Sequence, residues 1–218
     1  MANDGAAMER ATTADATRKV LLIHGIWMPA LSMRWMAARL AQAGYEPALH
    51  AYAGAAGGPD AALPGLVARL GAGPTHVLAH SLGGLITLST LAAHPELPVR
   101  RVVCLGSPLC GSAAAGGLAR RAWTAAALGR SAELLLHGCP PWRGRAEVAV
   151  IAGSTPHGLG RYFGDLGPDS DGTVAVAETR LDGLSDHAVI AASHTGLLFS
   201  AEAAAMAAAY FRHGRLRA

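Results

Sequence analysis

The chain alternates short apolar segments with longer segments of helical periodicity, and this alternation constrains its fold more than any other feature. Val20–Ile23 is apolar at every position, as expected of a strand buried on both faces of a sheet. Thr75–His80 is a second strand-like segment, and a helical segment, 82–93, follows it almost without a loop. Strands that alternate with helices of this length predict a three-layer α/β domain with a mainly parallel sheet.

The remaining elements extend this pattern over a single domain at 18–218, preceded by a polar, unpatterned segment, 1–17, that we expect to be a flexible tail. Further helices are predicted at 32–43, about 60–70 and 197–211, and further strands at 45–52, 99–105, 147–152, 173–177 and 188–191. One segment, 109–146, is too long for a simple connection. It predicts one or two helices, either as a short helical cap over the site or as an ordinary crossover helix with long ends.

Composition limits the class of protein. The 218 residues suffice for one sizeable core, and 51% apolar with 15% charged residues indicates a globular chain. The 18 Lys and Arg are scattered and the net charge is only +3, which favours a solvated surface over a nucleic-acid interface. The three cysteines, Cys104, Cys110 and Cys139, form no CxxC pair. They argue against a disulfide framework or zinc site and predict a reducing, cytoplasmic location.

Several ligand and membrane signals are missing from the sequence. The first twenty residues contain no apolar run, so no secretory signal is expected, and no apolar stretch is long enough to predict integral membrane association. Metal-ligand spacings and a glycine-rich phosphate loop are also not found. We therefore expect neither a metal nor a cofactor. Oligomeric state cannot be predicted from these features.

The motif with the most chemical content is Ala79–Gly84, which reads AHSLGG and lies directly between a strand and a helix. A sharp turn there exposes a serine hydroxyl, here that of Ser81, at the carboxyl edge of the sheet. It also directs the helix N-terminus, with the Leu82 backbone N–H, at a developing oxyanion. The turn is crowded, so Ala79 and Gly83 meet its need for small residues. The motif predicts a nucleophile at Ser81; the alternative is a helix N-cap.

A second element of the same chemistry is His24–Trp27, which reads HGIW at the end of the first apolar strand. Serine hydrolases with a nucleophile on such a turn need a second backbone N–H from the loop after an early strand. Gly25 permits that loop to approach closely, and the Ile26 N–H is the expected donor. Taken alone, a strand ending in His-Gly could also be a plain turn.

With these motifs, Leu105–Pro108 (LGSP) and Ser193–Phe199 (SHTGLLF), the chain resembles small bacterial esterase and lipase families of the α/β-hydrolase fold. The nearest in pattern are the minimal lidless lipases of bacilli and bacterial proteins similar to the GPI inositol-deacylase group. The resemblance runs from about 19 to 213 and is loose between 109 and 146. Position 79 is Ala where many relatives carry Gly, but the bacillus-type lipases also carry Ala at this position.

The resemblance implies the order nucleophile, acid, base. Asp171, in the sequence DGTV, matches the acid-bearing turn of the family, with Asp169 and Asp165 as competitors and a plain Asx turn as the alternative. His194 precedes the last helix and is the expected base. Among the ten histidines, His80 should point away from Ser81 into the scaffold, while His157 and His187 lack the loop-then-helix context.

These residues predict a carboxylic-ester hydrolase that acts through Ser81, His194 and Asp171 and forms an acyl-enzyme. The expected substrate is a small-molecule or lipid ester. Trp27 and Leu197 are candidate substrate-binding residues, although core packing would also explain either one. An acyltransferase, thioesterase or amidase would use the same triad, and a non-catalytic binding scaffold of hydrolase ancestry is a further alternative.

Overall fold

A computed structural model describes residues 17–120, 122–158 and 163–217, so the expected tail, 1–17, lies outside the described residues except for Thr17. Within these residues, six parallel strands form one sheet in the order β2-β1-β3-β4-β5-β6. The strands are β1 (Lys19–Ile23), β2 (Glu46–His50), β3 (Thr75–His80), β4 (Val99–Leu105), β5 (Glu147–Gly153) and β6 (Asp186–Ile190). The predicted mainly parallel sheet is confirmed.

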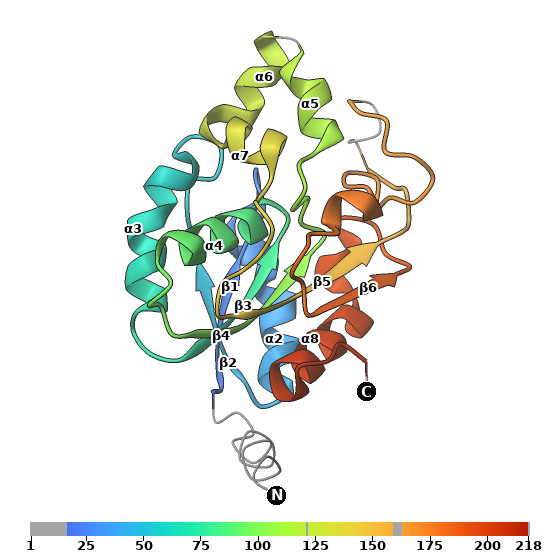
Figure 1. The fold of residues 1–218 in the computed structure, drawn as a ribbon. Coiled ribbons are helices and arrows are strands. Elements are labelled where there is room, and N and C mark those ends of the chain that lie inside the picture. The colour runs from blue at the N-terminus through green and yellow to red at the C-terminus, as the bar shows by residue number, and fades with distance from the viewer. Residues whose placement is uncertain (1–16, 121, 159–162, 218) are drawn as a thin grey trace, which may run out of the picture.

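Helices cover both faces of the sheet and complete three layers (Figure 1). One face carries α2 (Arg34–Gln42) and α8 (Ala201–His213), and the other carries α3 (Gly58–Leu70) and α4 (Leu82–Ala93). Because β3 lies in the middle of the sheet, its side chains are buried on both faces. The first core contains Leu22, Leu78, Met36, Leu40, Tyr210 and Phe211, and the second contains Val77, Val102, Leu66, Leu85 and Leu91.

Three short helices occupy the segment expected to hold one or two. They are α5 (Ala113–Ala119), α6 (Ala122–Leu128) and α7 (Ala132–His137), with a 3₁₀ turn, η2 (Gly129–Ser131), between the last two. They gather at one end of the molecule, beyond the carboxyl ends of the central strands (Figure 1). We call residues 113–137 the cap. Two hydrogen bonds close the base of the cap: the Ser112 N–H donates to Leu135 C=O at 2.9 Å, and the Cys139 N–H donates to Leu109 C=O at 2.7 Å.

The strand predicted at 173–177 is wrong. The Asp171 carboxylate accepts the N–H groups of Thr173 (2.9 Å) and Val174 (2.7 Å), and a 3₁₀ turn, η4 (Val176–Thr179), follows. These local bonds take the backbone donors that a sheet ladder would need. The apolar residues that suggested a strand are nevertheless buried: Val174 and Val176 are 3% and 9% exposed.

The helix predicted over 197–211 is divided in two. A 3₁₀ turn, η5 (Gly196–Phe199), is separated from α8 by Ser200, whose backbone is extended at φ −84° and ψ 117°. The Ser200 hydroxyl accepts the Ala203 N–H at 3.1 Å and so caps α8. Periodicity alone did not reveal this break, because the apolar residues of both pieces face the same core.

Helix α4 packs directly on the end of β1, which explains the glycine two residues after Ser81. A β-carbon at Gly83 would lie 2.7 Å from the carbonyl oxygens of both Ile23 and His24. We expect Gly83→Ala to lower the free energy of unfolding by about 1–3 kcal/mol, since backbone must move to admit the methyl group. A helical Gly→Ala change normally stabilises by up to about 1 kcal/mol.

Urea unfolding of Gly83→Ala against Gly116→Ala measures this effect with a matched control. Gly116 lies in α5, and a β-carbon there would meet nothing within 4 Å. The control should therefore equal or exceed wild-type stability. A Gly83→Ala protein as stable as the control would contradict the packing argument.

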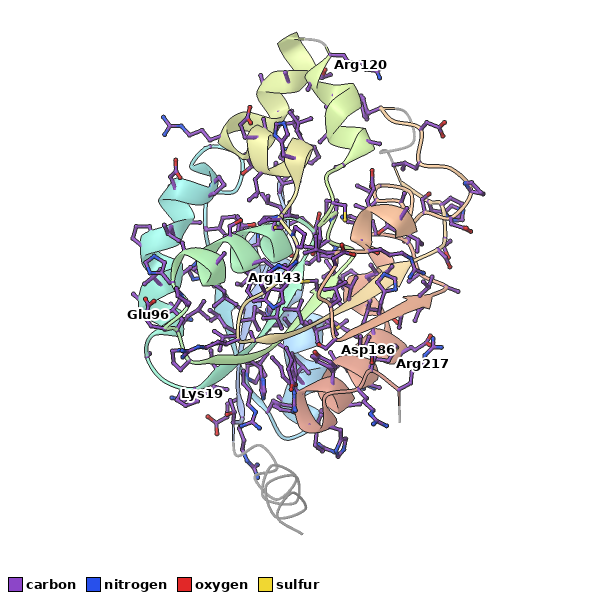
Figure 2. The ribbon with its side chains drawn as sticks, viewed as in Figure 1. Lys19, Glu96, Arg120, Arg143, Asp186 and Arg217 are labelled. Atoms are coloured by element: carbon purple, nitrogen blue, oxygen red, sulfur yellow. The ribbon has the colours of Figure 1, made fainter. Side chains whose placement is uncertain are left out.

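Lys19, Arg120 and Arg217 are exposed and lie at the periphery of the fold (Figure 2), whereas Arg101 and Asp171 are buried. Within the described ranges, no helix combines the length and apolar character needed to cross a bilayer.

Candidate active site

Ser81 lies on a strained turn between β3 and α4. Its backbone adopts φ 54° and ψ −123°, a conformation that non-glycine residues rarely take. The turn is held by the Ser81 N–H, which donates to Leu105 C=O at 2.9 Å, and by the Gly84 N–H, which donates to Ser81 C=O at 3.0 Å. The Ser81 side chain makes no capping hydrogen bond to the helix, so the N-cap alternative is wrong. The hydroxyl instead faces a cavity.

His194 and Asp171 form a buried pair. Nδ1 of His194 lies 2.7 Å from Oδ2 of Asp171, and the two side chains are 12% and 1% exposed. The other carboxylate oxygen, Oδ1, accepts the N–H groups of Thr173 and Val174. Asp171 therefore shapes an Asx turn and also binds the imidazole. With the proton on Nδ1 facing the carboxylate, Nε2 of His194 is the basic nitrogen.

The competing acids and bases have other roles. Asp165 accepts the Gly167 N–H at 3.1 Å, as a turn former does, and Asp169 lies outside the His194–Asp171 pair. His187 lies on β6, and its Nε2 is 2.8 Å from the Thr179 hydroxyl. Among the described groups, no set of three or more His, Cys, Asp or Glu side chains is placed to hold a metal ion.

Parallel strands bring these residues to one edge of the sheet. Ser81 follows β3, Asp171 lies in the loop after β5, and His194 lies after β6. Gly106, which follows β4 at φ 53°, has an essential place between them: a β-carbon there would lie 2.9 Å from Asp171 Oδ2 and 3.2 Å from His194 Nδ1. Sequence reasoning missed this role, although the strand-ending Leu-Gly-Ser-Pro motif was its signal.

The base lies beside the residue that precedes Ser81, because the His194 ring is 4.6 Å from the His80 ring. No hydrogen bond joins Ser81 Oγ to the His194 ring in the part of the chain that the structure describes. Such bonds commonly tighten only when substrate binds.

The loop after β1 passes directly against the nucleophile. A β-carbon at Gly25 would lie 3.0 Å from Ser81 Cβ, closer than nearly all real contacts of a β-carbon, so glycine favours this approach. The next residue, Ile26, lines the cavity beside Ser81. The loop is supported from below by Tyr52, whose hydroxyl donates to His24 C=O at 2.7 Å and whose ring stacks on the His24 ring at 4.3 Å. Burial lowers the pKa of His24. Tyr52 had no signal in the sequence.

His80 supports the base through its backbone. As expected, its side chain is buried in the scaffold. Its Nε2 lies 3.1 Å from the His194 carbonyl oxygen, and the two rings are 4.6 Å apart. Because the acceptor is a carbonyl, Nε2 of His80 carries the proton. Burial, with the neighbouring His194 charge, lowers the pKa of His80 to about 3, so the ring is neutral at physiological pH.

This depressed pKa makes folding sensitive to acid. In the unfolded chain His80 takes up a proton near its ordinary pKa of 6.5, whereas in the folded chain it does so only near 3. The stabilising contribution is complete above pH 6.5 and is lost as the pH falls toward 3. One such group should account for about 2–3 kcal/mol of the unfolding free energy lost between pH 6.5 and about pH 4.5.

Urea unfolding of wild type and His80→Gln across this range isolates that contribution. The amide of Gln can still donate to the His194 carbonyl but does not titrate. The buried His24 and His50 and the half-buried His187, whose pKa values are also lowered, are present in both proteins. Parallel stability curves for the two proteins would contradict the prediction.

A cavity of about 500 Å³ opens beside Ser81 between the sheet and the cap. Its lining contains no charged side chain in the described portion of the chain and consists of Ile26, Trp27, Ser81, Pro108, Ser112, Ala114, Ala115, Leu118, Thr124, Ala127, Leu128, Leu135, Phe163, Thr173 and Val174. Trp27 thus lies where a substrate-binding residue is expected. Leu197 does not: it is fully buried and packs in the core beneath Gly106, so core packing explains it.

No protein-family model and no curated protein sequence matches the chain. Solved structures do. The mature lipase BlEst2 of Bacillus licheniformis is 20% identical over 84% of this chain and 87% of its own, with a TM-score of 0.66. Phospholipase PlaB from Legionella pneumophila is 15% identical over 94% of this chain and 60% of its own, at 0.64. A pyrethroid hydrolase from Sphingobium faniae JZ-2 is 16% identical over 91% and 98%, at 0.61.

At this level of identity the likeness is one of fold. The chain has the α/β-hydrolase fold: a parallel sheet covered by helices on both faces, with Ser81 on the turn after β3. The predicted fold class is confirmed. The likeness to the GPI inositol-deacylase group stays a prediction.

Proposed function

We propose that the protein is a serine hydrolase that cleaves carboxylic esters through Ser81, His194 and Asp171. The observation that carries this proposal is the buried His194–Asp171 pair, joined at 2.7 Å, at the same edge of the sheet as a strained Ser81 that lines an apolar cavity. A helix N-cap serine needs neither a base nor a cavity. The combination of a strained nucleophile, a base and an orienting acid is the arrangement that acyl transfer requires.

The reaction follows from these positions. Ser81 Oγ attacks the ester carbonyl carbon while Nε2 of His194 takes the hydroxyl proton, and the Asp171 carboxylate stabilises the resulting imidazolium. The N–H groups of Ile26 and Leu82 flank the carbonyl oxygen as it becomes an oxyanion. The C–O bond to the alcohol then breaks and His194 protonates the leaving alcohol. Water, deprotonated by His194, releases the acid from the acyl-enzyme.

The cavity supports an apolar acyl group as the buried part of the substrate. Uncharged and largely apolar walls cannot compensate the desolvation of a charged group. A cavity of about 500 Å³ lies within the size range of small-molecule sites, and each buried methylene contributes roughly 0.8 kcal/mol. Structures of the same fold are named a lipase, a phospholipase and a pyrethroid hydrolase, which also supports ester cleavage.

Hydrolysis of p-nitrophenyl esters from acetate to palmitate tests the proposal. We expect the activity to rise from acetate to medium-chain esters as the acyl group fills the cavity. We also expect a serine-directed phosphonate to react with Ser81, and peptide mass spectrometry would locate the modified residue. Acyl transfer to added alcohols or amines, or cleavage of thioesters or amides in preference to esters, would indicate the alternative reactions of the same triad. A protein that neither turns over nor reacts with the phosphonate would be a binding scaffold.

We keep the cytoplasmic location as part of the proposal. Cys104, Cys110 and Cys139 are free thiols, as is usual in a reducing compartment.

A further inference from the structure

Trp27 has an unusual backbone conformation. Among the described residues other than glycine, only Trp27 and Ser81 have a positive φ, at 60° and 54°. Strain of this kind persists only where the surrounding contacts enforce it. At Ser81 the strand-to-helix turn enforces it. At Trp27, burial of the side chain is not the cause, because the ring is 60% exposed.

The contact that holds Trp27 is a hydrogen bond to the cap. Its indole Nε1–H donates to the carbonyl oxygen of Ala127 at 2.7 Å, across 100 positions of sequence. Ala127 lies in the last turn of α6, where helix carbonyls lack intrahelical partners. The bond therefore joins the loop that carries the Ile26 N–H to the C-terminal turn of α6 in the cap.

The cap is itself held in place on both sides of α6. After α6, the Arg130 N–H donates to Ala55 C=O at 3.1 Å, and the Ser131 hydroxyl donates to Gly54 C=O at 2.6 Å. Before α6, the Glu178 carboxylate accepts the Ala113 N–H of α5 at 2.6 Å. A cap anchored at both ends can serve as a fixed support for the loop.

The same carboxylate connects the cap to the acid-bearing loop. Glu178 also accepts the Ala175 N–H at 2.9 Å, four residues beyond Asp171. The cap therefore has hydrogen bonds to two loops. One is the loop 24–28, which carries the Ile26 N–H and is called the oxyanion loop below, and the other carries the acid Asp171.

We propose that Trp27 is a positioning residue for the oxyanion loop. Its indole hydrogen bond to Ala127 makes the position of the Ile26 N–H depend on the position of the cap. This inference rests on the proposed function. Ala127 and its neighbour Leu128 line the cavity that would hold the acyl group. An acyl chain that fills the cavity contacts the same helix that carries the Trp27 acceptor. The position of the oxyanion donor then depends on how the cap sits over the substrate.

Hydrogen–deuterium exchange of Trp27→Phe tests, without any substrate, whether this hydrogen bond holds the loop to the cap. Phenylalanine keeps an aromatic ring but removes the N–H donor. We expect amides in the loop 24–28 and in α6 to exchange about threefold to tenfold faster, the change that the loss of one hydrogen bond produces, while the strands keep wild-type rates. Trp142→Phe is the matched control, because it removes an indole bond to the Ala146 carbonyl at 2.8 Å. It should leave both segments unchanged.

Steady-state kinetics of the same variants test the catalytic consequence. A misplaced oxyanion donor should lower kcat of Trp27→Phe roughly tenfold, for acetate and longer esters alike. This loss in kcat is smaller than the roughly 10²–10³-fold loss when a donor is removed entirely. KM should stay within about threefold of the wild-type value. Unchanged exchange in both segments would overturn the proposal. A rise in KM for long esters alone would overturn it too, since Trp27 would then only line the pocket. A wild-type protein inactive on every ester would refute the proposed function. Hydrogen–deuterium exchange would still show whether the Trp27–Ala127 hydrogen bond holds the loop to the cap.

Discussion

Ser81→Ala is expected to lower kcat for p-nitrophenyl ester hydrolysis by roughly 10⁴–10⁶, leaving only what substrate binding and the oxyanion donors supply. The fold should be unaffected, because the Ser81 hydroxyl makes no hydrogen bond to the helix that follows it. The strained turn is held by backbone bonds that alanine retains. Steady-state kinetics on purified protein, with circular dichroism to verify folding, measure the loss.

Two companion variants sharpen this result. His194→Ala should lose a similar factor, and the double variant little more, because residues of a catalytic unit are strongly non-additive. Ser107→Ala is the matched serine control: Ser107 is fully buried after β4 and does not line the cavity. It should retain activity within about threefold, as expected of a residue outside the site. Wild-type activity in Ser81→Ala would refute the proposed mechanism.

Asp171→Asn is expected to lower kcat by roughly 10⁴ while the protein stays folded. The backbone N–H groups of Thr173 and Val174 both donate to Oδ1, so an asparagine must turn its carbonyl oxygen toward them. Its NH₂ group then faces Nδ1 of His194. Because that group is a donor, Nδ1 must give up its proton, which moves to Nε2 and removes the base.

A neighbouring carboxylate and an alanine variant provide the controls. Asp169→Asn should retain near wild-type kcat, because Asp169 lies outside the His194 pair. Asp171→Ala should lose activity and also stability, by about 1–3 kcal/mol, because two buried N–H groups lose their acceptor. If kcat of Asp171→Asn stayed within tenfold of wild type, Asp171 would be only a turn former.

Much of the fold could be predicted because its signals are local. The apolar segment Val20–Ile23 and the strand-turn-helix around Ser81 each reflect propensities of a few neighbouring residues. The failures were also local. At 173–177 the side chain of Asp171 competes with the ladder for backbone donors, and at Ser200 a cap divides a periodic segment. The periodicity of apolar residues does not predict such hydrogen bonds between a side chain and the backbone.

Positions in the site were predictable to different degrees. Ser81 and the Gly25 loop have crowding requirements that the residue types themselves express. The importance of Gly106 was not visible, because its constraint comes from Asp171 and His194, which arrive from later strands. His80, Tyr52 and Trp27 act through backbone carbonyls far along the chain, and a carbonyl has no residue identity that a sequence could display.

The sequence by itself determined the six strands of the parallel sheet, the helices between the first four of them and the sharp turn at Ser81, since periodicity and small residues specify local backbone geometry. Only the tertiary structure decided how the cap folds over the cavity, which loop it holds and why Gly106 must lack a side chain. These features depend on contacts between segments far apart in the sequence, 65 residues for Gly106 and Asp171 and 100 for Trp27 and Ala127. Such contacts are selected by the packing of the whole domain and by the satisfaction of backbone groups, which no local window of sequence contains.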